Sequence, residues 1–300
     1  MFSGCCNLGA VTLEPDREVL TRLGVQVLAP LGGRLNQHWL VNRRGERLVL
    51  RRWAAVPNDL EYEVKLLERV AGLGWPVAPI LERCTDAAGC EWSLSALLIG
   101  QPVTDKNSPR EQRVRGRLLA EFHFSLETIG DLGQREEWRR CEDILRDATL
   151  EPLLIEHEGS NPFEARVLLW HLERARALIA PLSPREQAGI VVHGDFAPWN
   201  LLFLDGKLSG ILDFELAHAD HRIADFALAW RGRYDDVIRA YDEVAPISAG
   251  EWALLTPLWW AQLLEGACRN IRAGVCDDEW TIKMLLRRSP LMGAASSAYR

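Results

Sequence analysis

The stretch "VVHGDFAPWNLLFLDGKLSGILDFE" (residues 191–215) joins short apolar runs to a dense set of polar groups. "GIVV" (189–192), "LLFL" (201–204) and "LSGIL" (208–212) are each typical of a strand, and "DGK" between the last two predicts a tight hairpin turn at Asp205–Gly206. The ends of these strands carry side chains that bind cations or move protons: His193, Asp195, Asn200, Asp213 and Glu215.

The predicted hairpin brings an amide and a carboxylate together. Asn200 lies approximately opposite Ile211, and Asp213 is then its diagonal neighbour, about 7–8 Å away. Both side chains can reach one cation at that separation, and Asp195 lies on the loop just before. Mg²⁺ prefers oxygen ligands and is usually held by one or two carboxylates together with substrate phosphates. A further carboxylate that does not bind the metal can accept the proton of an attacking hydroxyl, so this pattern favours a phosphoryl-transfer site.

Composition excludes several classes of protein. The 300 residues suffice for one large domain or two lobes, and the 48% hydrophobic and 26% charged residues are ordinary for a soluble globular protein. The net charge of −7 argues against nucleic-acid binding and is compatible with a cationic small substrate. No apolar run reaches the roughly 18 residues of a membrane helix, and no secretory signal is recognisable, so no membrane partner and a cytoplasmic location are expected.

The seven cysteines show no paired C-x-x-C spacing, so we expect neither a zinc site nor a disulfide framework.

The character of the chain changes near Gly100–Pro102. Before it, strands are predicted at 25–31, 38–41, 47–53 and 92–100, with one helix at 59–74. After it, helix start signals recur in "SPREQ" (108–112 and 183–187), "NPFE" (161–164) and "SAGE" (248–251). Apolar spacing predicts these inward-facing residues: Leu60, Val64, Leu67 and Ala71 in the first helix, and Val114, Leu118 and Phe122 in a helix at 109–126.

We therefore expect an α+β fold with a mainly antiparallel β lobe at residues 1–99, containing one helix, and a larger, mainly helical lobe at residues 100–300. The cleft between two such lobes is the default ligand site.

The motifs also resemble those of a known family. "HGDFAPWN" (193–200), followed eighteen residues after its Asp by "DFE" (213–215), resembles the catalytic and metal-binding loops of the aminoglycoside phosphotransferase / choline kinase family, small-molecule relatives of protein kinases. The resemblance implies a two-lobed, protein-kinase-like fold that binds ATP and Mg²⁺. It implies these roles: Asp195 as catalytic base, His193 as a brace of its loop, Asn200 and Asp213 as Mg²⁺ ligands, and Asp225 of "IADFALAW" as the buried acceptor of hydrogen bonds from the catalytic loop.

The N-terminal segments continue the resemblance. "LGGRLNQHWLV" (31–41) resembles the family's glycine-containing phosphate loop, through Gly32 and Gly33. Arg51 stands where kinases generally carry a Lys that contacts ATP, and Arg keeps the charge and can bind phosphate oxygens by two bonds. Glu63 resembles the helix Glu that pairs with that cation, with Glu61 as the alternative. "LSALLIG" (94–100) resembles the hinge that meets adenine, through Ser95, Ala96 and Leu98.

The acceptor of the phosphoryl group stays open. Only eleven residues separate Asp213 from Asp225, too few for the substrate loop of protein kinases, so the resemblance implies a small hydroxylated acceptor: an aminoglycoside, a choline-like amine, another amino-alcohol or a sugar. Trp199 and Trp260 are either lining residues of an acceptor pocket or core residues.

Two other functions are left as alternatives: a catalytically silent nucleotide-binding protein and a metal-dependent hydrolase. "HADH" (218–221) echoes part of a metallo-hydrolase pattern, but no His follows it, so structural histidines are expected there.

Overall fold

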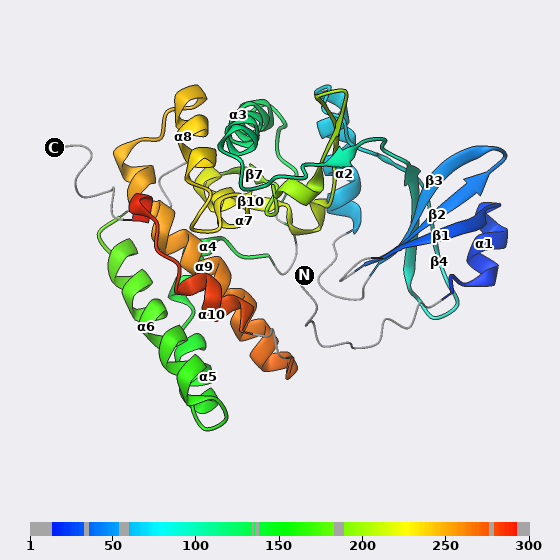
Figure 1. Ribbon diagram of the computed structural model, residues 1–300. Helices are drawn as coiled ribbons and strands as arrows, with labels where there is room; N and C mark the ends of the chain where they lie inside the picture. The colour runs from blue at the N-terminus through cyan, green and yellow to red at the C-terminus, as the bar shows by residue number, and fades with distance from the viewer. Residues whose placement is uncertain are drawn as a thin grey trace. The chain divides into compact units, whose positions relative to one another are not determined.

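The computed structural model describes residues 14–32, 36–53, 60–133, 135, 138–182, 189–275 and 279–292. These residues, drawn as ribbons in Figure 1, divide into two compact units. The first unit comprises Met1–Pro102, Asp131–Glu137 and Trp199–Glu215, and the second comprises Val103–Gly130, Trp138–Pro198 and Leu216–Arg300. Because the units are defined by contacts and not by chain order, the predicted lobe boundary after residue 99 stays a prediction.

The first unit is mainly antiparallel sheet. It contains α1 (Arg17–Leu23), β1 (Gln26–Gly32), β2 (Gln37–Arg43), β3 (Glu46–Arg52), α2 (Leu60–Gly72), β4 (Ile80–Thr85), β5 (Glu91–Ala96), β6 (Gln101–Pro102), β8 (Leu201–Leu204) and β9 (Lys207–Ile211). Strands pair in the order β1-β2-β3-β5-β4 in one sheet and β6-β8-β9 in a second. The predicted strands are present, although the one predicted at 92–100 ends at Ala96; α1, β4 and β6 were not predicted.

The two faces of the five-stranded sheet have different roles. Because side chains alternate along a strand, Leu48 and Leu50 of β3 face one side and Val49 and Arg51 the other. The first side forms a core beneath α1, made of Val19, Leu23, Val25, Trp39, Val41, Leu48, Leu50, Cys84, Trp92 and Leu94. Asp16 caps α1 by accepting hydrogen bonds from the N–H groups of Glu18 and Val19.

The β8–β9 hairpin differs from its predicted register by one residue. Asp205 and Gly206 form the turn with φ values of 51° and 76°, as a two-residue hairpin loop requires. Leu204 pairs with Lys207, but an irregularity between Leu202 and Phe203 moves the pairing of Leu201 to Ile211. The Leu212 N–H therefore donates to the Asn200 carbonyl at 2.8 Å. Asn200 lies opposite Leu212 and not Ile211, because the bulge adds one residue to β9.

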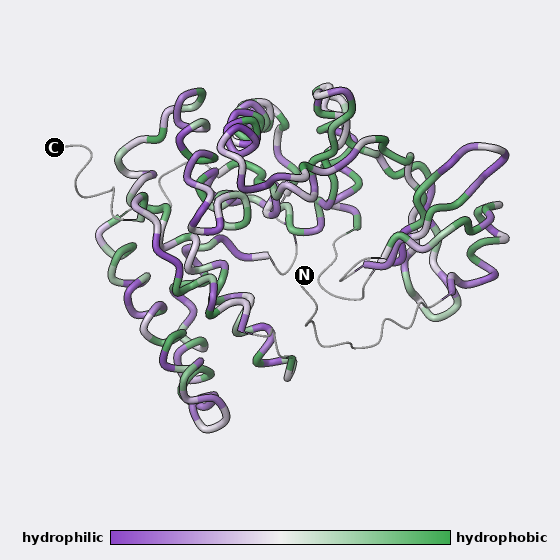
Figure 2. Tube along the Cα trace, viewed as in Figure 1, coloured by the Kyte–Doolittle hydropathy of each residue, from purple (hydrophilic) through white to green (hydrophobic). Residues whose placement is uncertain are grey.

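The second unit is mainly helical. It contains α3 (Pro109–Leu126), α4 (Cys141–Arg146), α5 (Leu150–His157), α6 (Pro162–Ile179), β7 (Ile190–Val192), β10 (His218–Asp220), α7 (Phe226–Trp230), α8 (Asp235–Val244), α9 (Ala249–Ala273) and α10 (Trp280–Leu285). Hydrophilic and hydrophobic segments alternate along α5, α6 and α9, as expected of helices that bury one face (Figure 2). The predicted α+β class, with an N-terminal antiparallel sheet and a mainly helical remainder, is confirmed.

Two predicted helix faces were right only in part: Leu67 of α2 and Phe122 of α3 are buried, but the other predicted residues are only half-buried. In α2 the buried residues are Tyr62, Glu63, Leu66, Leu67 and Val70, and in α3 they include Gln112, Arg115, Leu119, Phe122 and His123. Buried polar side chains occupy part of each inward face, and apolar periodicity does not detect them. None of the helices in the described part of the chain combines the length with the apolar composition that crossing a bilayer requires.

Helix capping follows the sequence only in part. Asn161 accepts from the Glu164 N–H, and Ser248 and Glu251 form a reciprocal capping box at α9. Pro109 occupies the first turn of α3 as predicted, but the Ser108 side chain makes no capping hydrogen bond. The second "SPREQ" copy lies outside the described residues.

Ser248→Ala is expected to lower the free energy of unfolding by about 1 kcal/mol, because it removes the acceptor for the Glu251 N–H at the start of α9. Chemical denaturation measures this difference. Ser108→Ala is the matched control and is expected to change stability by less than about 0.5 kcal/mol. Equal losses from both substitutions would contradict the capping assignment.

Candidate active site

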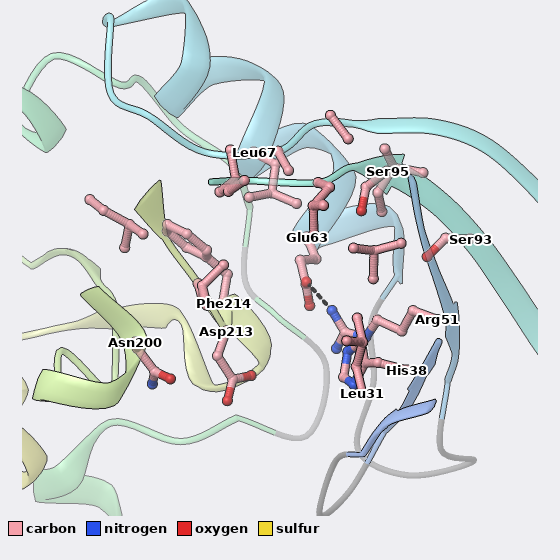
Figure 3. Close-up of a pocket in the computed structure, with 18 of the residues that line it drawn as sticks. Leu31, His38, Arg51, Glu63, Leu67, Ser93, Ser95, Asn200, Asp213 and Phe214 are labelled. Atoms are coloured by element: carbon pink, nitrogen blue, oxygen red, sulfur yellow. Dashed lines mark hydrogen bonds and ion pairs between the residues drawn. The ribbon is translucent and has the colours of Figure 1, made fainter. Parts of the chain in front are cut away.

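A cavity of about 350 Å³ lies in the first unit (Figure 3). The β1–β2 strands contribute Gly32 and His38 to its lining, and β3 contributes Arg51. The predicted hinge residues Ser95, Ala96 and Leu98 also line it, as do Asn200 and Asp213 from the two ends of the hairpin. Segments far apart in the chain thus supply one pocket. Gly33, the other predicted phosphate-loop glycine, lies outside the described residues.

Arg51 is a cation that lines this cavity. Its Nη1 lies 2.6 Å from Glu63 Oε1, and its guanidinium carbon lies 3.7 Å from the centre of the Trp53 ring. The alternative Glu61 instead pairs with Arg83 on an exposed surface. Within the described residues, Nε and Nη2 of Arg51 are buried and have no hydrogen-bond acceptor. Such donors fit the oxygens of a phosphate group.

His38 lines the same cavity without adding positive charge. Burial, together with the charge of Arg51, lowers the pKa of His38 to about 4, although a hydrogen bond to the Gly32 carbonyl opposes this. Its imidazole is therefore neutral near pH 7.

Asn200 and Asp213 lie close together at the open ends of the hairpin. The Leu212 N–H to Asn200 hydrogen bond joins their backbones, and Figure 3 shows the polar ends of both side chains directed to the same part of the cavity. Asp213 has a φ of 67°, a left-handed conformation that costs a non-glycine residue on the order of 1 kcal/mol. Surrounding hydrogen bonds must therefore hold it in place.

Negative charge accumulates around Asp213. Burial raises the pKa of the Asp213 carboxyl, and Glu63 adds to the rise while Arg51 opposes it. Burial and the charge of Asp213 raise the pKa of Glu215 to about 7, although Arg51 lies 3.6 Å from it and Asn36 donates a hydrogen bond to it. Burial is the largest cause of both shifts, so each carboxyl group ionises less readily than it would in water.

The donor set fits a divalent cation. Asn200 and Asp213 offer oxygen atoms, which Mg²⁺ prefers, and a cation beside Asp213 would offset the buried negative charge. Within the described residues, no cluster of three His, Cys, Asp or Glu side chains forms a complete metal cage. An incomplete shell is what an ion needs if phosphate oxygens are to supply the remaining ligands.

The second unit contains the loop with Asp195. Asp225, with 0% exposure, accepts hydrogen bonds of 2.8 Å from the N–H groups of His193 and Gly194 and lies 3.0 Å from Nε2 of His123. The His193 ring in turn accepts from the Asp195 N–H at 3.2 Å. Gly194 has a φ of 80°, and a Cβ there would clash with the Leu216 carbonyl oxygen, so only glycine fits. These contacts fix the backbone on which Asp195 stands.

The two predicted tryptophans have different environments. Trp199 is 37% exposed, and its role in an acceptor pocket stays a prediction. Trp260 is only 6% exposed and packs edge-to-face on Trp170 and His171, where α6 meets α9. This packing favours the alternative that Trp260 is a core residue, and its role as an acceptor-pocket residue stays a prediction.

The "HADH" residues are structural. Asp220 accepts from the N–H groups of Cys141 and His221, and the His218 ring stacks on Trp138 at a centroid distance of 5.2 Å. Each polar group satisfies a neighbour in the core, as predicted.

Comparison with known proteins identifies the family. The model of a family described as "Phosphotransferase enzyme family" matches residues 26–255. The chain belongs to this phosphotransferase family. The resemblance expected from "HGDFAPWN" and "DFE" is thereby confirmed.

Curated relatives are homoserine kinases. One from Xanthobacter autotrophicus is 29% identical over 219 residues, which cover 67% of this chain and 65% of that protein. One from Methylobacterium radiotolerans is 28% identical over 215 residues, covering 66% and 64%. The matched region is thus just under two thirds of the length of these relatives.

Solved structures share the fold. A thermostable mutant of aminoglycoside phosphotransferase APH(4)-Ia, in a ternary complex with AMP-PNP and hygromycin B, aligns with a TM-score of 0.69 over 90% of this chain and 96% of that chain, at 16% identity. Spectinomycin phosphotransferase APH(9)-Ia, in complex with ADP and spectinomycin, aligns with a TM-score of 0.62 over 95% and 99%, at 10% identity. At these identities the likeness concerns the fold.

Asp225→Asn is expected to lower the free energy of unfolding by about 3 kcal/mol, because an amide leaves part of the buried donor set of Asp225 without an acceptor. Burial opposes ionisation, but hydrogen bonds and charge from His123 and His193 outweigh it and lower the pKa of Asp225. This contribution is present above the unfolded pKa and is lost as the pH falls through the folded pKa. The difference between the two proteins should therefore shrink below about pH 4.

Denaturant unfolding at several pH values measures this difference. Asp242→Asn is the control, since among the described residues Asp242 accepts only from the Ile247 N–H, at a half-exposed position. A wild-type and Asp225→Asn gap that stays constant down to about pH 2 would refute the assignment.

Proposed function

We propose that this protein transfers the γ-phosphoryl group of ATP, bound with Mg²⁺, to a hydroxyl group of a small molecule. The single observation that carries the proposal is the cavity that combines Arg51, paired with Glu63, with the oxygen donors of Asn200 and Asp213. Phosphoryl-transfer sites combine a cationic side chain that binds phosphate with oxygen ligands for Mg²⁺, and this pocket has both.

The nucleotide would occupy the cavity that the five-stranded sheet lines. Backbone groups around Ser95, Ala96 and Leu98 would meet the adenine, and the buried N–H groups of Arg51 that have no acceptor among the described residues would bind phosphate oxygens. Asn200 and Asp213 would hold Mg²⁺, which when bound offsets the charge of the phosphates and of the buried carboxylates.

Asp195 is the proposed general base. Its carboxylate orients the acceptor hydroxyl and takes its proton, while the acceptor oxygen forms a bond to the γ-phosphorus and the bond between that phosphorus and the β–γ bridging oxygen breaks. ADP is the leaving group. His193 and Asp225 act only through the backbone, by holding the loop in one conformation.

The acceptor class that we favour is the amino-alcohols. The curated relatives are named homoserine kinases, and homoserine carries a primary hydroxyl together with an amino group. Aminoglycosides, choline-like amines and sugars are the further candidates, since structural neighbours are complexes with aminoglycoside-type antibiotics.

A screen of ATP consumption over amino-alcohols, aminoglycosides and sugars tests the proposal, with Asp195→Asn beside the wild type. We expect turnover with an amino-alcohol in the wild type and a rate lower by about 10²–10⁴-fold in Asp195→Asn, because the proton acceptor is lost. Binding of Mg²⁺·AMP-PNP should survive. Asp236→Asn, a control at a half-exposed position of α8, should keep the wild-type rate.

Other outcomes separate the alternatives. Near-normal turnover by Asp195→Asn would show that Asp195 is not the base. Nucleotide binding without turnover on any acceptor would favour the silent binding protein, and phosphate release without an acceptor would favour the hydrolase.

A further inference from the structure

Arg135 is a buried cation that belongs to none of the sequence motifs. It lies in the short segment Asp131–Glu137, which packs within the first unit although it is distant in the chain from both the sheet and the hairpin. Its side chain has 0% exposure. A guanidinium in such a position costs several kcal/mol of desolvation unless partners compensate for it, so its contacts are informative.

The first partner of Arg135 is the backbone of the metal-binding loop. Its Nη1 donates to the Phe214 carbonyl oxygen at 3.1 Å. Phe214 directly follows Asp213, whose left-handed backbone requires external support. A hydrogen bond from a charged donor is stronger than one between neutral groups, so this contact fixes the peptide that follows the proposed Mg²⁺ ligand.

The second partner is Glu63. Arg51 lies at 2.6 Å from Glu63 Oε1, while Nη2 of Arg135 lies 3.8 Å from the other oxygen, Oε2. The Arg135 guanidinium also lies 5.4 Å from the ring centre of Tyr62, which directly precedes Glu63 in α2. The contact with Arg135 is an ion pair without a hydrogen bond, so it favours one orientation of the Glu63 carboxylate by charge alone. Glu63 in turn pairs with Arg51, which lines the cavity.

Charge balance gives the same result. Glu63, Asp213 and Glu215 place three carboxyl groups around this part of the unit, and Arg51 and Arg135 both lie within 4 Å of Glu63. Among the described residues, removing Arg135 would leave Arg51 as the only cation paired with Glu63, while Arg51 also lies 3.6 Å from Glu215. Arg51 would then be drawn toward the acids and away from a phosphate.

We propose that Arg135 is a positioning residue for the Mg²⁺·nucleotide site: it holds the Asp213 loop in its ion-binding conformation and Glu63 in the conformation that presents Arg51. The inference rests on the proposed function, because it names a residue on which that site depends. Arg135 touches no reacting atom and acts through Phe214 and Glu63.

Arg135→Met and Arg135→Lys test the proposal. Calorimetric titration with Mg²⁺·AMP-PNP, without any acceptor, should show affinity weakened by about tenfold for Met and by a smaller factor for Lys, which keeps the charge but cannot serve both partners. The Mg²⁺ concentration needed for half-maximal binding of AMP-PNP should rise in the same order. In turnover assays KM for ATP should rise, while KM for the acceptor stays unchanged.

Arg115→Met is the matched control. Arg115 is also fully buried, donates from Nη1 to a backbone carbonyl, that of Ala229, at 3.2 Å, and lies 5.2 Å from a tyrosine ring, but it belongs to the second unit. The Arg115→Met variant should lower thermal stability as Arg135→Met does, yet leave Mg²⁺·AMP-PNP affinity within about twofold of the wild type. A purely structural role for Arg135 would make the two variants alike.

The outcomes are separable. A folded Arg135→Met protein with wild-type affinity and Mg²⁺ dependence overturns the inference and leaves the proposed function standing. If Arg135→Met does not fold, the Lys variant decides in the same way. A wild type that binds no Mg²⁺·AMP-PNP overturns the proposed function itself, and the inference with it.

Discussion

The hydrogen bond from the Leu212 N–H to the Asn200 carbonyl joins the two open ends of the β8–β9 hairpin, which carry the side chains of Asn200 and Asp213. The left-handed backbone conformations of Asp205 and Gly206 form the turn and set the pairing of the two strands next to it. The bulge in β9 then shifts this pairing by one residue before the strands reach the cavity. Since a shift of one residue exchanges the faces of a strand, this offset decides which side chains meet. The oxygen donors of Asn200 and Asp213 share a cavity because the hairpin ends in this register.

The site is built at a cost in stability. Asp213 has a left-handed backbone, and burial raises the pKa of both Asp213 and Glu215. Arg51 and Arg135 compensate part of this charge through Glu63. Strain and uncompensated charge of this kind are typical of functional sites, where a ligand completes the balance. The cavity and the surrounding acids are therefore best understood as one electrostatic unit.

Much of this arrangement could be predicted because it follows from local chemistry: strand runs, turn residues and the spacing of acids within one hairpin. The pairing of Arg51 with Glu63 came from resemblance to kinases and matches the geometry. What could not be predicted depends on non-local contacts. Nothing in the sequence signals the bulge, and apolar periodicity misplaces helix faces that bury Glu63 or Arg115. Arg135 reaches the Phe214 carbonyl across 79 residues of chain, in a segment without a motif. The α1 helix has only seven residues, too few for a clear apolar periodicity, so its Asp16 cap is the main feature of the sequence that indicates a helix there.

The most direct test of the account is the position of the ion. A crystal of the protein with Mn²⁺ in place of Mg²⁺ and with AMP-PNP gives an anomalous difference map that locates the metal independently of the atomic coordinates. We expect an ion within about 2.0–2.3 Å of oxygen atoms of both Asn200 and Asp213, with phosphate oxygens completing its shell. An ion bound by only one of the two side chains, or a nucleotide complex whose metal lies away from both, would contradict it.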